Sequence, residues 1–80
     1  MKVDASLDLA GVACPINFVM AKLKLEELDP GQVLEVMVDD GAPCRNVPRS
    51  LAADGHAVLT VEEADGRWRI LVRRGVGPCP

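Results

Sequence analysis

The chain has 80 residues, with 9 Lys and Arg against 12 Asp and Glu, a formal net charge of −3 and 49% hydrophobic residues. This length allows one domain with a single core, and the apolar share argues against disorder. The acidic balance disfavours direct binding to nucleic-acid phosphates, and no apolar stretch approaches the roughly 20 residues that span a bilayer. Because no signal-like segment follows Met1, we expect a cytoplasmic protein without membrane contact.

The first half of the chain predicts a strand, a helix and a second strand. Residues 5–9 alternate between apolar and polar side chains, as a half-buried strand does. Pro15 then opens a helix that runs to Leu28, because proline is favoured at a first helical position. The following Asp29-Pro30-Gly31 ends this helix, and the β-branched residues of segment 33–38 predict a central strand.

The second half predicts a helix followed by a hairpin. A helix fits between Pro43 and Asp54, with Gly55 as its left-handed stop. A proline inside a helix removes a backbone hydrogen bond, so we expect a distorted turn over 43–47 and regular helix from Pro48. Residues 57–63 and 67–73 predict two strands joined through Asp65-Gly66, a strong hairpin signal.

This order, β-α-β-α-β-β, predicts a two-layer α/β (α+β) sandwich, in which two helices cover one face of a four-stranded mixed sheet. In the last strand, Trp68, Ile70 and Val72 would point to the helices. Four residues would line the open face: Arg67, Arg69, Leu71 and Arg73. We expect one domain over residues 1–74 and a flexible Gly/Pro-rich tail over 75–80.

Cys14 is the candidate reactive residue. It lies between a strand and a helix, immediately before Pro15, where unpaired backbone N–H groups and the helix dipole favour a thiolate. Thiols in such positions have pKa values lowered from about 8.5 towards roughly 3.5–7.5. The competing interpretation is a small apolar core residue, since free cysteines are commonly buried.

The chain offers Cys14 no partner base and no metal site. Its one histidine, His56, is expected at a helix-to-strand turn without a catalytic role. The three cysteines form no C-x-x-C pair, so neither a dithiol nor a paired-cysteine metal site is predicted. A low-pKa thiol without a base suits sulfur exchange, in which a thiolate attacks sulfur. The sequence therefore favours a carrier that needs no cofactor.

The helix after Cys14 has two apolar stripes at a spacing of 100° per residue. The first stripe consists of Phe18, Ala21, Leu25 and Leu28. The second, on nearly the opposite side, consists of Ile16, Val19, Met20 and Leu23. A two-layer domain can bury only one stripe fully, so the second is a candidate docking surface for partner proteins. The alternative is a wide face absorbed by the sheet and the second helix.

Several segments together form a pattern: Leu7-Asp8-Leu9-x-Gly11-x-x-Cys14-Pro15, Leu28-x-Pro30-Gly31-x-x-Leu34-Glu35-Val36, Asp39-Asp40, Val47-Pro48, Gly55-His56 and Ile70-Leu71-Val72-Arg73. This pattern resembles the TusA/SirA sulfur-carrier family over about residues 6–74. The resemblance implies a two-layer sandwich similar to the C-terminal domain of translation initiation factor three. It also implies that Cys14 accepts a sulfane sulfur as a persulfide and hands it on, with Pro15 starting the helix.

The resemblance further implies protein partners. Donors in the family are cysteine desulfurases or rhodanese-like proteins, and acceptors feed tRNA thiolation, molybdenum-cofactor maturation or sulfur assimilation and oxidation. The chain departs from the family's Cys-Pro-x-Pro motif at Asn17, and Asn46 stands where the family often has Asp. An asparagine in the first turn still supports helix initiation, and its amide can hydrogen-bond a thiolate or persulfide. The Cys-Pro-x-Asn form resembles a subgroup associated with sulfur assimilation.

Two other cysteines leave alternatives open. Cys44, near the start of the second helix, either relays the persulfide or is a partly buried small side chain. Cys79, in the tail, is either a second sulfur or metal ligand or an incidental exposed thiol. Besides a sulfur carrier, the sequence allows a regulatory or redox-sensing module of the same fold, or metal delivery through Cys14 and Cys79. A monomer or weak dimer is expected.

Overall fold

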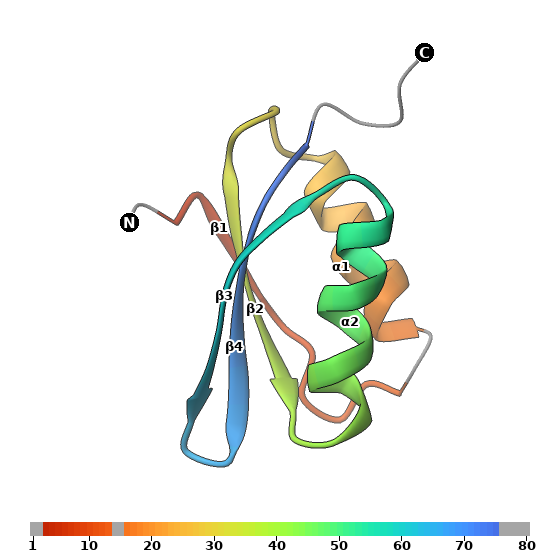
Figure 1. Ribbon diagram of the computed structural model, residues 1–80, viewed down its shortest axis with the longest axis vertical. Coiled ribbons are helices and arrows are strands. Elements are labelled where there is room, and N and C mark those ends of the chain that lie inside the picture. Colours follow the sequence, from red (N-terminus) through yellow and green to blue (C-terminus); the bar gives the residue numbers. More distant parts are fainter. Residues whose placement is uncertain (1–2, 14–15, 76–80) are drawn as a thin grey trace.

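The computed structural model describes residues 3–13 and 16–75, apart from the side chains of residues 42–45 and 64. Its elements are β1 (Ala5–Asp8), α1 (Ile16–Glu26), β2 (Val33–Asp39), α2 (Ala42–Ala53), β3 (Ala57–Ala64) and β4 (Arg67–Arg73). The strand order is β1-β2-β4-β3, with β1 parallel to β2 and the other pairs antiparallel. Both helices lie on one face of the sheet (Figure 1). The predicted two-layer fold with a four-stranded mixed sheet is confirmed.

The end of α1 differs from the prediction by two residues. The helix stops at Glu26, and the next two N–H groups bond carbonyls three residues back: Glu27 to Lys24 at 3.1 Å and Leu28 to Leu25 at 3.0 Å. Such i to i−3 bonds tighten the chain into a 3₁₀-like turn, which ends the regular helix earlier than the apolar pattern does. The predicted start at Pro15 lies outside the described residues.

The predicted distortion of α2 is wrong. The helix is continuous over Ala42–Ala53 with Pro48 inside it. Proline removes only its own N–H from the ladder, and the helix is held by burial of Val47 and Leu51, both 0% exposed. Packing of these side chains into the core offsets the one missing bond, since helices in proteins draw most of their stability from tertiary packing.

The predicted stop of α2 at Gly55 is confirmed. Gly55 has a φ of 97° and its N–H donates to the Ala52 carbonyl at 3.1 Å. The N–H of His56 donates to the Leu51 carbonyl, also at 3.1 Å. These two bonds form a Schellman motif, which satisfies carbonyls that the helix end leaves free.

The β3–β4 hairpin also follows its prediction. Asp65 and Gly66 have φ values of 51° and 78°, the positive values that a type I′ turn requires at both central residues. The pairing of β3 with β4 shifts in register between Val58 and Thr60. This irregularity lies in an edge strand, where bulges commonly interrupt the ladder.

The core lies between the sheet and the two helices. The cluster consists of Leu9, Ala21, Leu25, Leu34, Val36, Val38, Val47, Leu51, Ile70 and Val72. In β4, Ile70 and Val72 are buried there and Trp68 packs partly against the cluster, as predicted. Leu71, predicted to line the open face, is only 4% exposed, so it is not a solvent-facing residue. Its strand is central, so Glu35 and Thr60 flank it from the two neighbouring strands.

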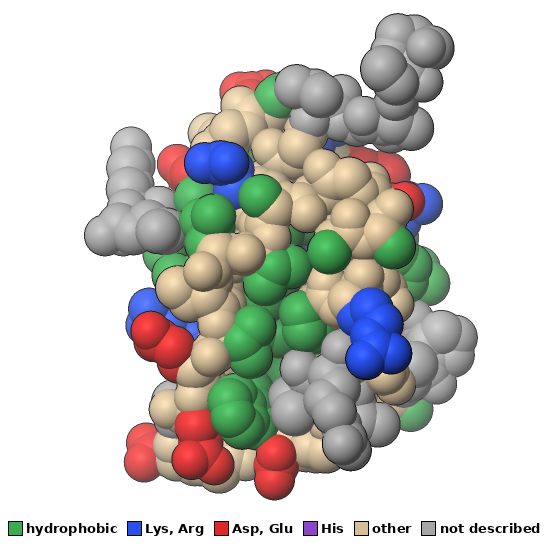
Figure 2. Space-filling view, in the orientation of Figure 1, with side chains coloured by type: hydrophobic (Ala, Val, Ile, Leu, Met, Phe, Trp, Pro, Cys, Tyr) green, Lys and Arg blue, Asp and Glu red, His purple; other side chains and the backbone are tan. Residues whose placement is uncertain are grey.

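The helices cover β3 less completely than β2 and β4. In β3, Val58 is only partly buried against the core, and Val61 is 41% exposed. Figure 2 shows hydrophobic side chains at the surface between the strands and α2. Burial is therefore deepest along the two central strands.

Candidate functional site at the junction of β1 and α1

The predicted reactive cysteine belongs to the connection between β1 and α1. Cys14 and Pro15 lie outside the described residues, and the described residues on either side are Ala13 and Ile16. β1 and β2 are parallel, so this connection leaves the sheet at the C-terminal ends of both strands. In open α/β sheets, ligands and reactive groups commonly lie beyond the C-terminal ends of parallel strands.

Hydrogen bonds fix the chain that leads to this junction. The N–H of Leu9 donates to the Met37 carbonyl at 2.8 Å, which extends the pairing of β1 with β2 by one residue. The N–H of Val12 then donates back to the Leu9 carbonyl at 3.0 Å, which closes a turn. Leu9 itself is 1% exposed and belongs to the core cluster. The connection is therefore anchored in the core at Leu9, ahead of the predicted reactive cysteine.

Three aspartates stabilise the same end of the sheet. Asp39 accepts a hydrogen bond from the N–H of Gly11 at 2.7 Å, although the two residues are 28 positions apart. Asp8 accepts from the N–H of Ala10 at 3.0 Å through Oδ1, and its Oδ2 lies 3.7 Å from Arg67. Asp40 Oδ1 accepts from the Nε1–H of Trp68 at 2.7 Å.

These carboxylates act as turn and side-chain acceptors. The sequence predicted a turn at Asp39-Asp40 and missed the bond from Gly11 to Asp39. Sequence periodicity carries no information on a contact between side chain and backbone across two strands, because that contact depends on the strand register.

Asn17 occupies the first turn of α1 and is fully buried. Its N–H donates to the Ala13 carbonyl at 3.1 Å, an i to i−4 bond that starts the helical ladder. The Asn17 side chain is 0% exposed and its Oδ1 accepts from the N–H of Phe18 at 2.7 Å. Among the described residues, Nδ2 of Asn17 has no hydrogen-bond partner. A buried amide donor without a partner costs about 1–3 kcal/mol of folding free energy.

The two apolar stripes of α1 are separated as the sequence predicted. Ala21 and Leu25 of the first stripe are buried, and Phe18 and Leu28 pack partly against the core. The second stripe is exposed: Ile16 by 54%, Val19 by 41%, Met20 by 38% and Leu23 by 55%. The alternative, that the sheet and α2 bury this stripe, is therefore wrong.

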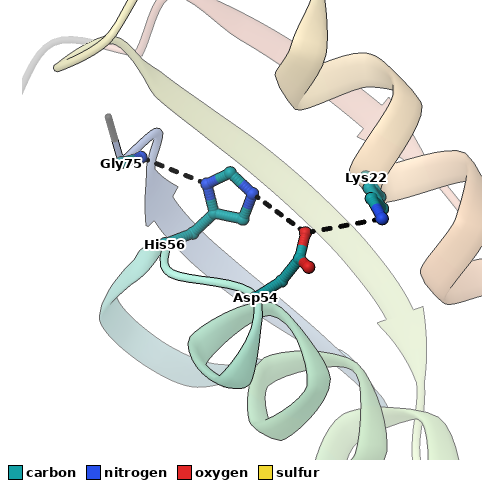
Figure 3. A network of polar contacts seen from close by, with 4 residues as sticks. All are labelled: Lys22, Asp54, His56 and Gly75. Atoms are coloured by element: carbon teal, nitrogen blue, oxygen red, sulfur yellow. Dashed lines mark hydrogen bonds and ion pairs between the residues drawn. The ribbon is translucent and has the colours of Figure 1, made fainter. Parts of the chain in front are cut away.

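His56 lies far from the junction and cannot act there as a base. Its Nδ1 accepts a hydrogen bond from the N–H of Gly75 at 3.1 Å, and its Nε2 lies 3.6 Å from Asp54, which is 3.8 Å from Lys22 (Figure 3). The next residue, Ala57, is joined through Arg73 to Val33, at the start of β2. The junction lies beyond the other end of that strand, about 20 Å away at 3.3 Å per residue. The predicted turn position is confirmed, but His56 is buried and bonded.

The described residues do not test the predicted roles of Cys44 and Cys79. Cys44 belongs to the first turn of α2, and its side chain is outside the described set. Cys79 and the rest of segment 76–80 are also outside it. The Arg74 carbonyl accepts from the N–H of Gly31, just after the C-terminal end of α1, whereas Cys14 precedes the N-terminal end.

The chain length after Gly75 limits what Cys79 can reach. The 11 residues of α1 span about 16 Å. Four residues from Gly75 to Cys79 reach at most about 14 Å when fully extended. Within one molecule, a contact between Cys79 and Cys14 would need the tail to run back along the whole of α1.

The described part of the chain contains neither a metal-ligand cluster nor a helix able to span a membrane. No group of three or more His, Cys, Asp or Glu residues there is placed to hold a metal ion. Within the same residues, neither helix combines the length and apolar character that crossing a bilayer requires.

The fold and the Cys-Pro junction together define a class of small α+β sulfur carriers, and comparison with known proteins supports this class. The sequence model of the family described as sulfurtransferase TusA matches residues 5–74. The chain belongs to this family.

Individual relatives agree with the family assignment. A relative from Archaeoglobus fulgidus is 44% identical over 75 residues, covering 92% of this chain and 85% of that one. Sulfur carrier protein TusA from Pseudomonas paraeruginosa is 32% identical over 72 residues, covering 90% of this chain and 91% of that one. The crystal structure of a SirA-like protein from Desulfitobacterium hafniense superposes with a TM-score of 0.75 at 28% identity, covering 89% of this chain and 97% of that one. The family and the sulfur-carrier role therefore rest on most of the chain.

Proposed function

We propose that this chain accepts a sulfane sulfur on Cys14 as a persulfide and transfers it to an acceptor protein. The observation that carries the proposal is the position of Cys14-Pro15 between β1 and α1 in a chain of the TusA family. The N-terminus of a helix favours negative charge, which supports a thiolate and, after loading, a persulfide anion. The bond from Gly11 to Asp39 and the anchoring of Leu9 hold the chain that leads to Cys14 at this end of the sheet, which supports the proposal.

The transfer is an exchange between sulfur atoms. The Cys14 thiolate attacks the outer sulfur of a donor persulfide, R–S–SH. The new S–S bond forms on Cys14 as the donor's S–S bond breaks, giving Cys14–S–SH and the donor thiolate R–S⁻. The sulfane sulfur keeps its oxidation state, so the step needs no external oxidant or reductant. In the second exchange, a thiolate of the acceptor removes the outer sulfur in the same way and restores the Cys14 thiolate.

The exposed stripe of α1 supports a docking role in both exchanges. It begins at Ile16, two residues after Cys14, so a protein bound there would face the reactive residue. We propose that a cysteine desulfurase or a rhodanese-like protein docks on this stripe as donor. Free thiols persist in reducing compartments, so we propose a cytoplasmic location for this chemistry.

The test is sulfur loading of the three single cysteine variants. The protein is incubated with a cysteine desulfurase and cysteine, and the intact mass is measured with and without reductant. We expect one extra labile sulfur atom on the wild type, on Cys44→Ser and on Cys79→Ser, and none on Cys14→Ser. Sulfur retained by Cys14→Ser would overturn the assignment of Cys14.

A second measurement separates the carrier from a module in which Cys14 is merely structural. The rate of alkylation of Cys14 is followed against pH in the Cys44→Ser/Cys79→Ser double variant. A carrier thiol is alkylated well below pH 8. An unperturbed thiol, with a pKa of about 8.5, begins to ionise only near pH 8. A thiol that reacts only after the protein unfolds would overturn the carrier role and favour the structural alternative.

A further inference from the structure

The side-chain amide of Asn17 differs from the other buried polar group of the chain. Only Asn17 and His56 are buried polar residues in the described part of the chain, and His56 is hydrogen-bonded through Nδ1. The Nδ2 group of Asn17 carries two N–H donors and has no partner among the described residues. Buried polar groups are almost always paired, so an unpaired donor calls for a ligand or a functional role.

The orientation of this amide is defined by its other end. Within an asparagine side chain only Oδ1 accepts hydrogen bonds, and the N–H of Phe18 donates to the Asn17 side chain at 2.7 Å. The atom nearest Phe18 is therefore Oδ1, which assigns the free end of the amide as Nδ2. The free end consequently offers hydrogen-bond donors only, and its ligand must be an acceptor.

The position of Asn17 in the first turn of α1 predicts which acceptor this donor serves. Asn17 starts the buried stripe of α1, which continues with Ala21 and Leu25. Side chains on a helix lean towards its N-terminus, over the residues three and four positions earlier. For Asn17 these are Cys14 and Ala13, and the Ala13 carbonyl already accepts the backbone N–H of Asn17. Cys14 lies three positions before Asn17 in the sequence, and its sulfur is the acceptor there that ionisation makes negatively charged.

We propose that the Asn17 side-chain amide donates a hydrogen bond to the anionic sulfur carried by Cys14, the thiolate before loading and the persulfide after it. This inference rests on the proposed function and assigns a specific role to the residue that replaces the second proline of the family motif. A proline at this position offers no side-chain donor, whereas asparagine offers two. The amide would therefore lower the energy of the charged sulfur relative to its protonated form.

The first experiment compares Asn17→Leu with the parent in the Cys44→Ser/Cys79→Ser background. Leucine has the branching of asparagine but no donor. We expect the half-maximal pH of Cys14 alkylation to rise by about one unit, and the rate well below that pH to fall about tenfold. Leu25→Val, further along the same buried stripe, serves as the matched control and should leave the pH profile unchanged. Circular dichroism and thermal unfolding establish that both variants fold.

The second experiment needs no variant at position 17. The proton resonances of the Asn17 side-chain amide are followed by NMR against pH in the wild type and in Cys14→Ser. We expect these resonances to shift with the same midpoint as Cys14 alkylation and to lose that shift in Cys14→Ser. The inference would be overturned if the amide resonances do not shift as Cys14 ionises. It would also be overturned if Asn17→Leu folds and keeps the parent's pH dependence of Cys14 alkylation.

The outcome is distinguishable from failure of the proposed function. If the wild type takes up sulfur on Cys14 and neither experiment shows a response, the carrier role stands and the role of Asn17 does not. If the wild type takes up no sulfur on Cys14, the proposed function fails, and the amide titration then reports on the thiolate alone.

Discussion

The backbone N–H of Gly75 donates a hydrogen bond to Nδ1 of His56 at 3.1 Å, which ties the chain after β4 to the turn between α2 and β3. A side chain added at Gly75 would overlap the carbonyl oxygen of Gly55, so the two segments touch backbone to backbone. Nδ1 accepts this bond, which leaves the proton of the neutral ring on Nε2, facing Asp54 at 3.6 Å. This contact holds the C-terminal end of the domain at the end of the sheet opposite to the junction.

Gly75→Ala is therefore expected to destabilise the fold. The added methyl group forces the segment away from Gly55 and breaks the bond to His56, leaving a buried ring nitrogen unpaired. We expect a loss of about 1–3 kcal/mol in the free energy of unfolding, measured by urea denaturation. In a double-mutant cycle with His56→Ala, the two losses should be less than additive, because both variants remove the same bond. Fully additive losses would contradict the coupling.

Two leucines of α1 provide a matched test of which face of the helix carries the packing. Leu25 is 0% exposed and Leu23 is 55% exposed on the same helix. Leu25→Ala should lower the free energy of unfolding by about 2–5 kcal/mol, because it leaves a cavity in the core. Leu23→Ala should change it by less than about 0.5 kcal/mol. Equal losses would show that the exposed stripe is covered in solution.

The bond between Gly11 and Asp39 is expected to control local order before the junction. Asp39→Ala removes the acceptor of the Gly11 N–H, so that amide should exchange with solvent faster by about tenfold. Hydrogen exchange followed by NMR measures this directly. The N–H of Gly31, bonded to the Arg74 carbonyl at 2.9 Å at the other end of the domain, is the internal control and should keep its rate. Unchanged exchange at Gly11 would show that the bond does not protect it.

The docking role of the α1 stripe predicts a difference between protein and small-molecule donors. Val19→Glu places a charge in the stripe and should slow sulfur uptake from a cysteine desulfurase by about tenfold, a loss typical of one contact residue. Uptake from a small persulfide should stay unchanged, since such a donor needs no docking surface. Val61→Glu is the matched control, because Val61 and Val19 are each 41% exposed and lie on different elements. Equal slowing by both variants would contradict docking at the stripe.

Much of the fold could be predicted because its signals are local. The hairpin follows from Asp65-Gly66, since both residues tolerate the positive φ values of 51° and 78° that the turn requires. The stop of α2 follows from Gly55 for the same reason, and the period of apolar residues separates the two faces of α1. The predicted distorted turn over residues 43–47 was wrong because a local rule counted the hydrogen bond lost at Pro48 and omitted the burial of Val47 and Leu51.

Some features of the candidate site can likewise be predicted from the sequence, and others depend on tertiary packing. The adjacent residues Cys14 and Pro15 and the departure at Asn17 can be read from the sequence directly. The burial of the Asn17 amide, the exposure of the stripe from Ile16 to Leu23 and the burial of Leu71 depend on which layer covers which face.

The amino-acid order thus determined the succession of strands and helices, the turns between them and the position of the candidate reactive cysteine in the chain, because each depends on the backbone preferences of neighbouring residues. Tertiary structure alone decided that Asp39 holds Gly11 and that His56 holds Gly75. Those partners are 28 and 19 positions apart, and they meet only once strand register and helix packing bring their atoms within hydrogen-bond distance.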